Sequence, residues 1–254
     1  MALSTDGDVA IKIMGAWETA ETLTGFYSSD SPWYSLEAAK ASPTFDGVDM
    51  DAAKELMDAY INDPARSDEK TPGDKVTLAY SCVAVPALMD LAQVQQAVWG
   101  ELGVELEIQS VELAAMTERL VGSADTDPSF KGSFQINCSE QGGGADDPLS
   151  VFRRFFGPVA TSPSNITNYT NPEIDEQLEI LQKTTDFATR YAAVEKIQTI
   201  AAEDVPLIWF FVTPAVVGHK DSINGVADWQ LPSGSTGEGT PDATVRFHQV
   251  WLED

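Results

Sequence analysis

The sequence predicts an α/β fold: an open, mostly parallel sheet with helices on both of its faces. Two strand-like runs, 76–80 and 103–111, flank a helical pattern, and strand–helix–strand units of this kind form right-handed parallel pairs. A second helical pattern and a third strand-like run, "SFQINC", come next. A loop and a short helix then follow. The order β-α-β-α-β-loop-α is typical of open sheets covered on both faces.

Hydrophobic periodicity supports each of these elements. In 103–111, Val104, Leu106 and Ile108 alternate with polar residues, the pattern of a half-exposed strand. The helix before it starts near Pro86 and stops at Gly103. Its apolar face is expected to contain Leu88, Leu91, Gln95, Val98 and Leu102, and the next helix is expected to bury Leu113, Met116 and Leu120. "PLSVFRRFFG" predicts a short helix from Pro148 to Gly157.

A helical hairpin is predicted over 172–205. Asn171 stands at the cap position, Pro172 at the first helical position, and Pro206 ends the second helix. The run "LIWFFV" at 207–212 then predicts a buried strand. The faces expected to pack together contain Ile174, Leu178 and Leu181 in the first helix, and Phe187, Tyr191, Val194, Ile197 and Ala201 in the second.

The two ends of the chain are less regular. Residues 1–73 predict a helix around 8–25, a loop over 28–47, a helix over 49–60 and no strand. Residues 231–243 predict an exposed loop, and 244–253 a closing strand. We therefore divide the chain into a helical segment, 1–73, and an α/β lobe, 74–254.

Charge excludes several classes of function. The 254 residues carry a formal net charge of -25, which disfavours binding to nucleic acids and to anionic membrane surfaces. The sequence has no apolar run of the roughly 18–20 residues that span a bilayer. The amino-terminal residues show no signal peptide. An acidic surface suits a saline or extracytoplasmic setting.

The cysteines and histidines do not predict a metal site or a cofactor. Cys82, Cys138, His219 and His248 lack the close spacing of metal ligands. Cys82 and Cys138 both stand at predicted carboxyl ends of strands, so a disulfide is one alternative. Because bridges between adjacent parallel strands are geometrically awkward, two buried free thiols are the favoured interpretation.

The stretch "QINCSEQGGGADDPL" at 135–149 contains three consecutive glycines followed by two aspartates. It lacks the lysine of a P-loop and the spacing of a dinucleotide-binding loop. Glu140, Asp146 and Asp147 could serve as the carboxylates of a hydrolase. Turn and cap roles are favoured, with Asp147 capping the helix that begins at Pro148.

Three tryptophans lie at positions that are typical of ligand clefts. Trp33, Trp209 and Trp229 lie in or beside predicted loops and strand ends, and at least one of them is expected to face a ligand. Trp99, on a helix, is expected in the core.

Residues 168–211 resemble the signature region of the family 5 extracellular solute-binding proteins, the oligopeptide-, dipeptide- and nickel-binding-like components of ABC importers. The segments 49–60, 103–120 and 147–156 are similar to other parts of that family, in the family's order. The signature positions that match are Tyr169, Asn171, Pro172, Asp175, Asp186, Arg190, Gln198 and Pro206.

The resemblance implies one lobe of a type II periplasmic-binding-protein-like fold and a binding protein that is not an enzyme. It implies that this chain is the carboxyl-terminal lobe with its crossover helices, without the amino-terminal lobe and the export signal. The implied partners are a small solute, peptide or oligosaccharide, and the permease subunits, with hinge closure around the solute. We expect an extracytoplasmic monomer that meets the membrane only through a lipid anchor or the permease.

The resemblance also places the glycine-rich loop at the ligand cleft, beyond the carboxyl ends of the strands. Peptide binders of the family commonly have Trp-x-x-Asp here, where this chain has Gln141 and Gly144. A shift of two residues would let Asp146 substitute, so peptide and oligosaccharide ligands both stay open. A hydrolase using Glu140, Asp146 or Asp147 is the alternative function. The expected ligand-binding residues are Cys138, Ser139, Glu140, Gln141, Gly142, Gly144, Asp146, Trp33 and Trp209.

Overall fold

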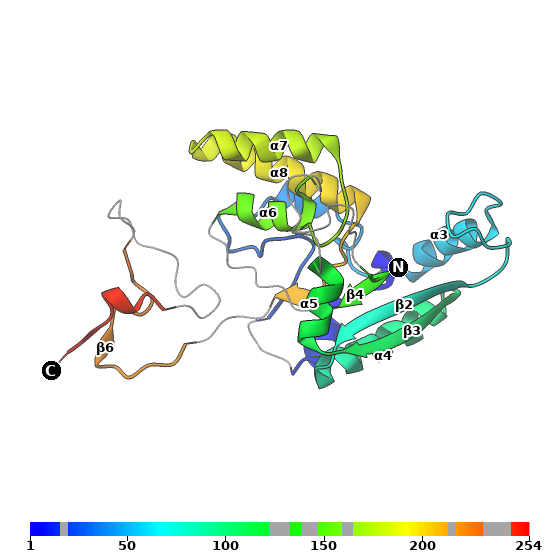
Figure 1. The fold of residues 1–254 in the computed structure, drawn as a ribbon, viewed down its shortest axis with the longest axis horizontal. Coiled ribbons are helices and arrows are strands. Elements are labelled where there is room, and N and C mark those ends of the chain that lie inside the picture. The colour runs from blue at the N-terminus through cyan, green and yellow to red at the C-terminus, as the bar shows by residue number, and fades with distance from the viewer. Residues whose placement is uncertain are drawn as a thin grey trace. The chain divides into compact units, whose positions relative to one another are not determined.

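The computed structural model describes residues 1–15, 20–121, 133–138, 147–158, 165–212, 217–230 and 245–253. The chain divides into two compact units, which we treat separately (Figure 1). The first unit consists of Met1–Glu140 and Asp147–Val212, and the second of Gln141–Asp146 and Thr213–Asp254.

A three-stranded parallel sheet forms the centre of the first unit. Its strands are β2 (Val76–Val83), β3 (Val104–Val111) and β4 (Ile136–Cys138), in the order β3-β2-β4. Val76 pairs with Val104 and Val83 with Val111, while Cys82 of β2 is opposite Cys138 of β4. The three predicted strands and their parallel arrangement are therefore confirmed.

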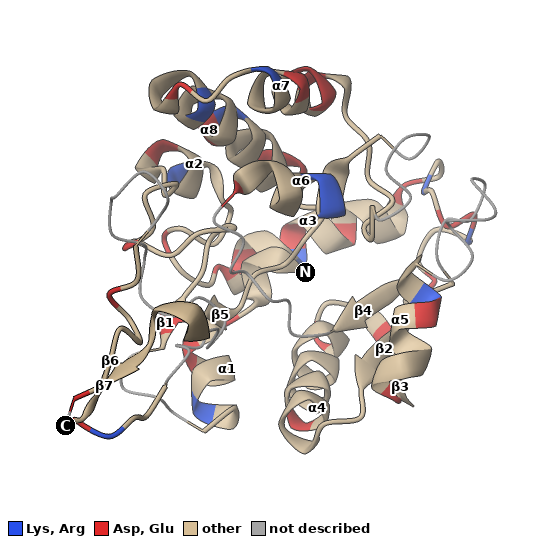
Figure 2. Ribbon diagram, turned by 60° about the vertical axis from the view of Figure 1, so that its left-hand side comes forward, with Lys and Arg blue, Asp and Glu red and all other residues tan. Residues whose placement is uncertain are grey.

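Helices cover both faces of this sheet, as predicted (Figures 1 and 2). On one face, α4 (Pro86–Gly100) places the ring of Trp99 5.8 Å from that of Tyr80. On the other face, α5 (Leu113–Val121) directs Arg119 towards β2 and β3, where its Nη1 donates to Ser81 Oγ at 2.7 Å and to Gln109 Oε1 at 2.8 Å.

The core around the sheet agrees with the predicted helix faces except at one position. Met116 is 1% exposed, but Leu113, predicted on the same face, is 65% exposed. Leu113 is the first residue of α5, where the helix meets the edge of the sheet, so it points away from the core. The buried residues of this core include Tyr80, Cys82, Leu88, Trp99, Leu102, Val104, Leu106 and Met116.

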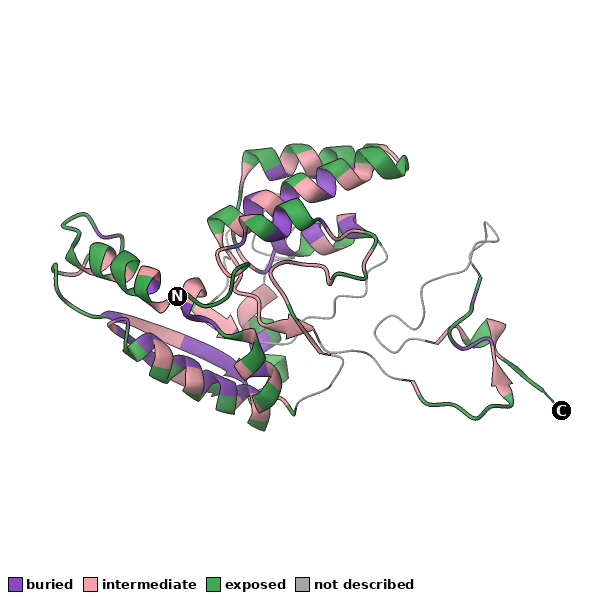
Figure 3. Ribbon diagram, turned by 180° about the vertical axis from the view of Figure 1, so that it is seen from behind, coloured by how far each residue is buried: buried purple, intermediate pink, exposed green. Residues whose placement is uncertain are grey.

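The predicted helical hairpin is present as α7 (Pro172–Lys183) and α8 (Phe187–Asp204), with α6 (Pro148–Phe156) packed against it. The Asn171 side chain caps α7 by accepting from the Glu173 amide at 2.9 Å, and Asp186 caps α8. The buried sides of these helices face one another in Figure 3. They form a second core that includes Phe152, Phe156, Ile174, Leu178, Leu181, Val194, Ile197 and Ala201.

The amino-terminal segment contains elements that the sequence did not predict. The short helix α2 (Leu36–Ala41) lies inside the predicted loop, with Ser35 as its cap, and packs against α8. The expectation of no strand was also wrong, because β1 (Glu21–Thr22) pairs antiparallel with β5 (Phe211–Val212). The remaining elements are η1 (Ala2–Ser4), α1 (Gly7–Ile13) and α3 (Met50–Asn62). Helix α3 matches its prediction, but α1 covers only the first part of the helix predicted around 8–25, because β1 occupies Glu21–Thr22.

The run 207–212 was predicted as a buried strand, and this was also wrong. Only its last two residues form β5, and all six are half-buried. A strand becomes fully buried when other strands pair along its whole length and both faces are covered. The two-residue pairing with β1 does not provide this.

The connection from α3 to β2 is held by one buried cation. The Arg66 side chain is fully buried and forms an ion pair with Asp68, with Nε–Oδ1 at 2.6 Å. Its Nη1 donates to the carbonyl oxygens of Ile61 at 3.0 Å and of Asp74 at 2.7 Å. The guanidinium thus joins the end of α3 to the residues that lead into β2.

The second unit is small. The strand β6 (Ile223–Asn224) pairs antiparallel with β7 (Trp251–Leu252), and η3 (Phe247–Gln249) precedes β7. The Trp229 side chain is buried beneath the Arg246 guanidinium, which lies 4.8 Å from the ring centre. The predicted strand over 244–253 is confirmed only at Trp251–Leu252. The predicted loop over 231–243 lies outside the described residues.

Candidate functional site

The carboxyl ends of the three parallel strands lie at one edge of the sheet. They are Val83 of β2, Val111 of β3 and Cys138 of β4. In open α/β sheets, ligands bind beyond this edge. The candidate functional site is therefore this carboxyl edge with the chain segments that leave it, and the glycine-rich stretch begins directly after Cys138, as predicted.

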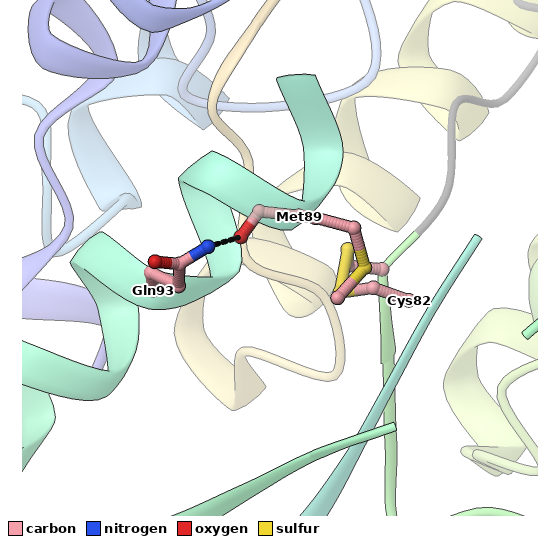
Figure 4. Close-up of a disulfide and its surroundings, with 4 residues drawn as sticks. Cys82, Met89 and Gln93 are labelled. Atoms are coloured by element: carbon pink, nitrogen blue, oxygen red, sulfur yellow. Dashed lines mark hydrogen bonds between the residues drawn. A yellow bond between two sulfur atoms is a disulfide. The ribbon is translucent and has the colours of Figure 1, made fainter. Parts of the chain in front are cut away.

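A disulfide joins Cys82 to Cys138 at this edge (Figure 4). Both side chains are buried, as predicted, but the favoured interpretation of two free thiols was wrong. The two residues are direct partners in the β2–β4 register, with their Cα atoms 4.6 Å apart. That separation lies within the usual range for disulfides, about 4.4–6.8 Å. The bridge fixes the end of β4 to β2, and Met89 of α4 lies beside it.

Asp147 marks the point where the described chain resumes after the glycine-rich stretch. Its Oδ1 accepts from the Leu149 amide at 3.1 Å and also from Nη2 of Arg190. The predicted cap role is therefore confirmed. Both contacts give the carboxylate a structural role, so Asp147 does not support the alternative that the protein is a hydrolase. Glu140 and Asp146, the other two carboxylates of that alternative, lie outside the described residues.

Arg190 connects several elements near this point. Besides Asp147, its Nη1 donates to the carbonyl oxygens of Leu181 and, at 3.3 Å, of Thr184. Its guanidinium carbon lies 5.9 Å from the centre of the Trp33 ring. One signature residue thus joins α8 to the start of α6 and the end of α7, which is a structural role.

Three other signature residues also form structural contacts. Tyr169 donates its hydroxyl hydrogen to Asp204, and Asn171 Nδ2 donates to the same hydroxyl oxygen at 3.1 Å. Gln198, which is 6% exposed, donates from Nε2 to the Trp33 carbonyl oxygen at 3.0 Å. The signature therefore describes how the helical hairpin is held together. It does not by itself reveal a ligand.

The two tryptophans of the predicted site have different surroundings. The half-buried Trp33 ring lies 5.0 Å from that of Phe187, and with Arg190 nearby it is engaged in contacts within the protein. Trp209 packs edge-on against Phe26, with ring centres 4.5 Å apart. It also lines a shallow surface depression together with Thr24, Ser42 and Leu207.

The remaining predicted ligand residues lie outside the described residues: Ser139, Glu140, Gln141, Gly142, Gly144 and Asp146. Sequence reasoning missed Tyr27, whose hydroxyl is buried and has no hydrogen-bond partner within the described part of the chain. Burial raises the pKa of Tyr27, the charge of Asp147 raises it further, and Arg190 opposes this shift. Tyr27 is therefore neutral at physiological pH.

The described residues contain neither a metal-binding cluster nor a membrane-spanning helix. No group of three or more His, Cys, Asp or Glu side chains in that part of the chain could hold a metal ion. None of the helices described has the length and apolar character needed to cross a membrane.

The open parallel sheet with helices on both faces has the fold of a lobe of the type II periplasmic-binding-protein class. The chain belongs to the bacterial extracellular solute-binding proteins of family 5. The model for the middle part of that family matches residues 10–163. No curated protein sequence matches the chain.

Several solved structures have a similar fold. A putative peptide-binding protein, AppA, from Clostridium difficile has a TM-score of 0.68 and 16% identity, covering 99% of this chain and 46% of that one. DppA from Helicobacter pylori, in complex with the peptide STSA, has a TM-score of 0.68 and 16% identity, covering 100% of this chain and 43% of that one.

A periplasmic oligopeptide-binding protein from Thermotoga maritima, with mannohexaose bound, has a TM-score of 0.65 and 18% identity, covering 92% of this chain and 43% of that one. This chain thus spans less than half the length of each of these three structures.

Proposed function

We propose that this chain is the carboxyl-terminal lobe of the substrate-binding component of an ABC importer. In this role it would hold one side of a solute at the carboxyl edge of its sheet and deliver the solute to permease subunits. The observation that carries the proposal is the parallel sheet with this edge, because it lies within the part of the chain that matches the family. Solute binding at such an edge agrees with the general behaviour of open α/β sheets.

The class of solute is proposed from the relatives. The Helicobacter pylori structure contains a peptide and the Thermotoga maritima structure contains mannohexaose. A peptide or an oligosaccharide is therefore the proposed ligand. We propose that the predicted ligand residues contribute to the site, namely Cys138, Ser139, Glu140, Gln141, Gly142, Gly144, Asp146, Trp33 and Trp209. Both tryptophans also have aromatic neighbours within the protein, Phe187 for Trp33 and Phe26 for Trp209.

We propose that the protein works outside the cytoplasmic membrane, in the periplasm or at the cell surface. The family is described as extracellular. The Cys82–Cys138 disulfide supports the same location, because disulfides form and persist in oxidising compartments and are rare in the cytosol.

We also propose that residues 1–73 are the crossover segment and 74–254 the lobe. The two parts are in contact: α2 packs against α8, and α3 packs against the core formed by the sheet and α4. Arg66 holds the connection between the two parts. The segment thus lies against the lobe within the first unit.

A thermal-shift screen of the protein tests the proposed function. The panel consists of short peptides, manno-oligosaccharides and nickel–histidine. A ligand at 100 times its dissociation constant adds about 2.7 kcal/mol of stability, so the melting temperature should rise with ligand concentration. Two results together would contradict the proposal. No compound would raise the melting temperature, and the protein would hydrolyse a model peptide or glycoside in a reaction that Asp147→Asn abolishes.

A further inference from the structure

Exposed apolar residues gather at the carboxyl edge of the sheet. Val85, two residues beyond the end of β2, is 42% exposed, and Leu113, two residues beyond the end of β3, is 65% exposed. The Ala84 amide donates to the Val111 carbonyl oxygen at 2.8 Å, which keeps the two strand ends side by side. We call this surface the ledge; it consists of the exposed residues Ala84, Val85, Pro86, Leu113 and Ala114.

The stability of the fold does not explain why residue 85 is a valine. It occupies the N-cap of α4, and no side chain in the described part of the protein caps that helix. Valine is among the poorest N-cap residues, and Ser, Thr, Asp or Asn would stabilise α4 more. Departures from a local rule of this kind are expected at functional positions. Six other helices are capped by a side chain, namely those of Asp6, Ser35, Asp49, Asp147, Asn171 and Asp186.

Packing does not explain Leu113 either. Other residues hold α5 against the sheet: Met116 is buried, and Arg119 donates to Ser81 and Gln109. A leucine exposed to this degree in the first turn contributes little to the core. A large apolar side chain here is therefore available for contact with another molecule.

The charge of the ledge limits what that molecule can be. Glu112 is the one ionisable residue among the described residues 84–86 and 112–114. The ledge is thus almost uncharged in a protein whose net charge is -25. The Glu112 carboxylate disfavours an anion, and the apolar side chains favour a group that loses water when it binds.

We propose that the ledge is the subsite for an uncharged apolar group of the solute, and that Val85 and Leu113 determine its specificity. The inference rests on the proposed function, because it assumes that the solute binds at this edge. It adds that the preferred solute has an aliphatic or aromatic group, so a fully hydroxylated sugar or an anion binds less well. The ledge consists of described residues and is independent of the glycine-rich stretch.

Three variants and three probes test this inference. The variants are Val85→Thr, Leu113→Gln and the control Leu56→Gln, since Leu56 is 62% exposed on α3, a helix that does not adjoin the carboxyl edge. The probes are the tripeptides Leu-Gly-Gly and Gly-Gly-Gly, and mannohexaose. Affinities are measured by NMR titration of the full chain, and stability by thermal unfolding.

We expect the unmodified protein to bind Leu-Gly-Gly about ten-fold more tightly than Gly-Gly-Gly, because one leucine side chain becomes buried. Val85→Thr and Leu113→Gln should remove most of this preference, and Leu56→Gln should retain it. Val85→Thr should also raise the melting temperature, since threonine can cap α4. Lower affinity together with higher stability is not expected from a purely structural role.

Two results would overturn the inference. If both ledge variants keep the full preference for Leu-Gly-Gly, or if mannohexaose binds and the tripeptides do not, the ledge does not select the solute, although the proposed function stands. If none of the three probes binds the protein, both the inference and the proposed function fail.

Discussion

At the scale of single residues, Arg190 shows what the family signature does in this protein. Its guanidinium contacts the Asp147 carboxylate and the carbonyl oxygens that end α7, and its side chain is only 14% exposed. A planar cation with several fixed donors suits such a junction better than lysine does. Arg190 therefore stabilises the start of α6, next to the stretch where we propose ligand binding.

Replacing Arg190 tests this role. We expect Arg190→Met to lower the free energy of unfolding by about 2–3 kcal/mol, because hydrogen bonds of a charged, mostly buried group are lost. The control is Lys183→Met, which removes an ion pair between exposed side chains and should cost much less. Urea unfolding measures both. Equal losses in the two variants would show that Arg190 is not a structural junction.

Residue-level prediction from sequence succeeded where the cause was local. The caps at Asp147 and Asn171 were predicted because a capping side chain acts on the next few amides of the same chain. The state of the cysteines was predicted wrongly, because it depends on which residues of β2 and β4 are opposite each other. The ledge was missed because exposure at a strand end depends on tertiary packing.

At the scale of elements, the helices were predicted better than the strands. Amphipathic periodicity and caps are contained within a helix, so α4, α7 and α8 appear close to their expected bounds. The two-residue strands β1 and β5 exist only because distant segments meet, and no pattern within either one specifies the pairing. Half-burial of 207–212 follows from the same short pairing.

The helical hairpin provides a matched pair of substitutions on one helix. Ile174 is fully buried in α7, whereas Ile180 of the same helix is 36% exposed. We expect Ile174→Ala to lower the free energy of unfolding by about 2–5 kcal/mol, since it leaves a cavity in the core shared with α8. Ile180→Ala should cost less than half as much. Similar costs in chemical denaturation would contradict the assigned faces of α7.

The disulfide between β2 and β4 is the second element-level prediction. Its cysteines are 56 residues apart, and a cross-link closing a loop of that length stabilises by about 4 kcal/mol in the chain-entropy treatment. Reductant should therefore lower the melting temperature of the native protein. Reductant should not change the melting temperature of the double variant Cys82→Ala/Cys138→Ala. Two reactive thiols in the unreduced, denatured protein would show that the bridge is absent.

At the scale of the whole molecule, charge is the dominant property. Forty acidic residues stand against fifteen basic ones, and the acids are spread over the helices and loops (Figure 2). Mutual repulsion of this kind destabilises the compact state, and salt screens it over roughly 10 Å at 0.1 M. The composition therefore suits a saline environment.

Salt should accordingly stabilise the protein. We expect the melting temperature at pH 7 to rise by several degrees between about 0.05 and 1 M NaCl, because added ions screen carboxylate repulsion. The same series at pH 4, where many carboxylates are protonated, is the control and should show a smaller rise. A melting temperature that falls with salt at pH 7 would indicate that attractive ion pairs outweigh the repulsion.

The central claim about the whole molecule is that its solute binds at the carboxyl edge of the sheet. This claim rests on the family assignment and on the parallel arrangement of the strands. Amide NMR spectra of the isotope-labelled protein, recorded during titration with short peptides and manno-oligosaccharides, test it most directly. We predict that the largest shift changes occur at residues 84–86 and 112–114, next to the carboxyl ends of β2 and β3. Changes centred on the opposite edge, around residues 73–76 and 101–104, would contradict the claim, as would spectra that no compound alters.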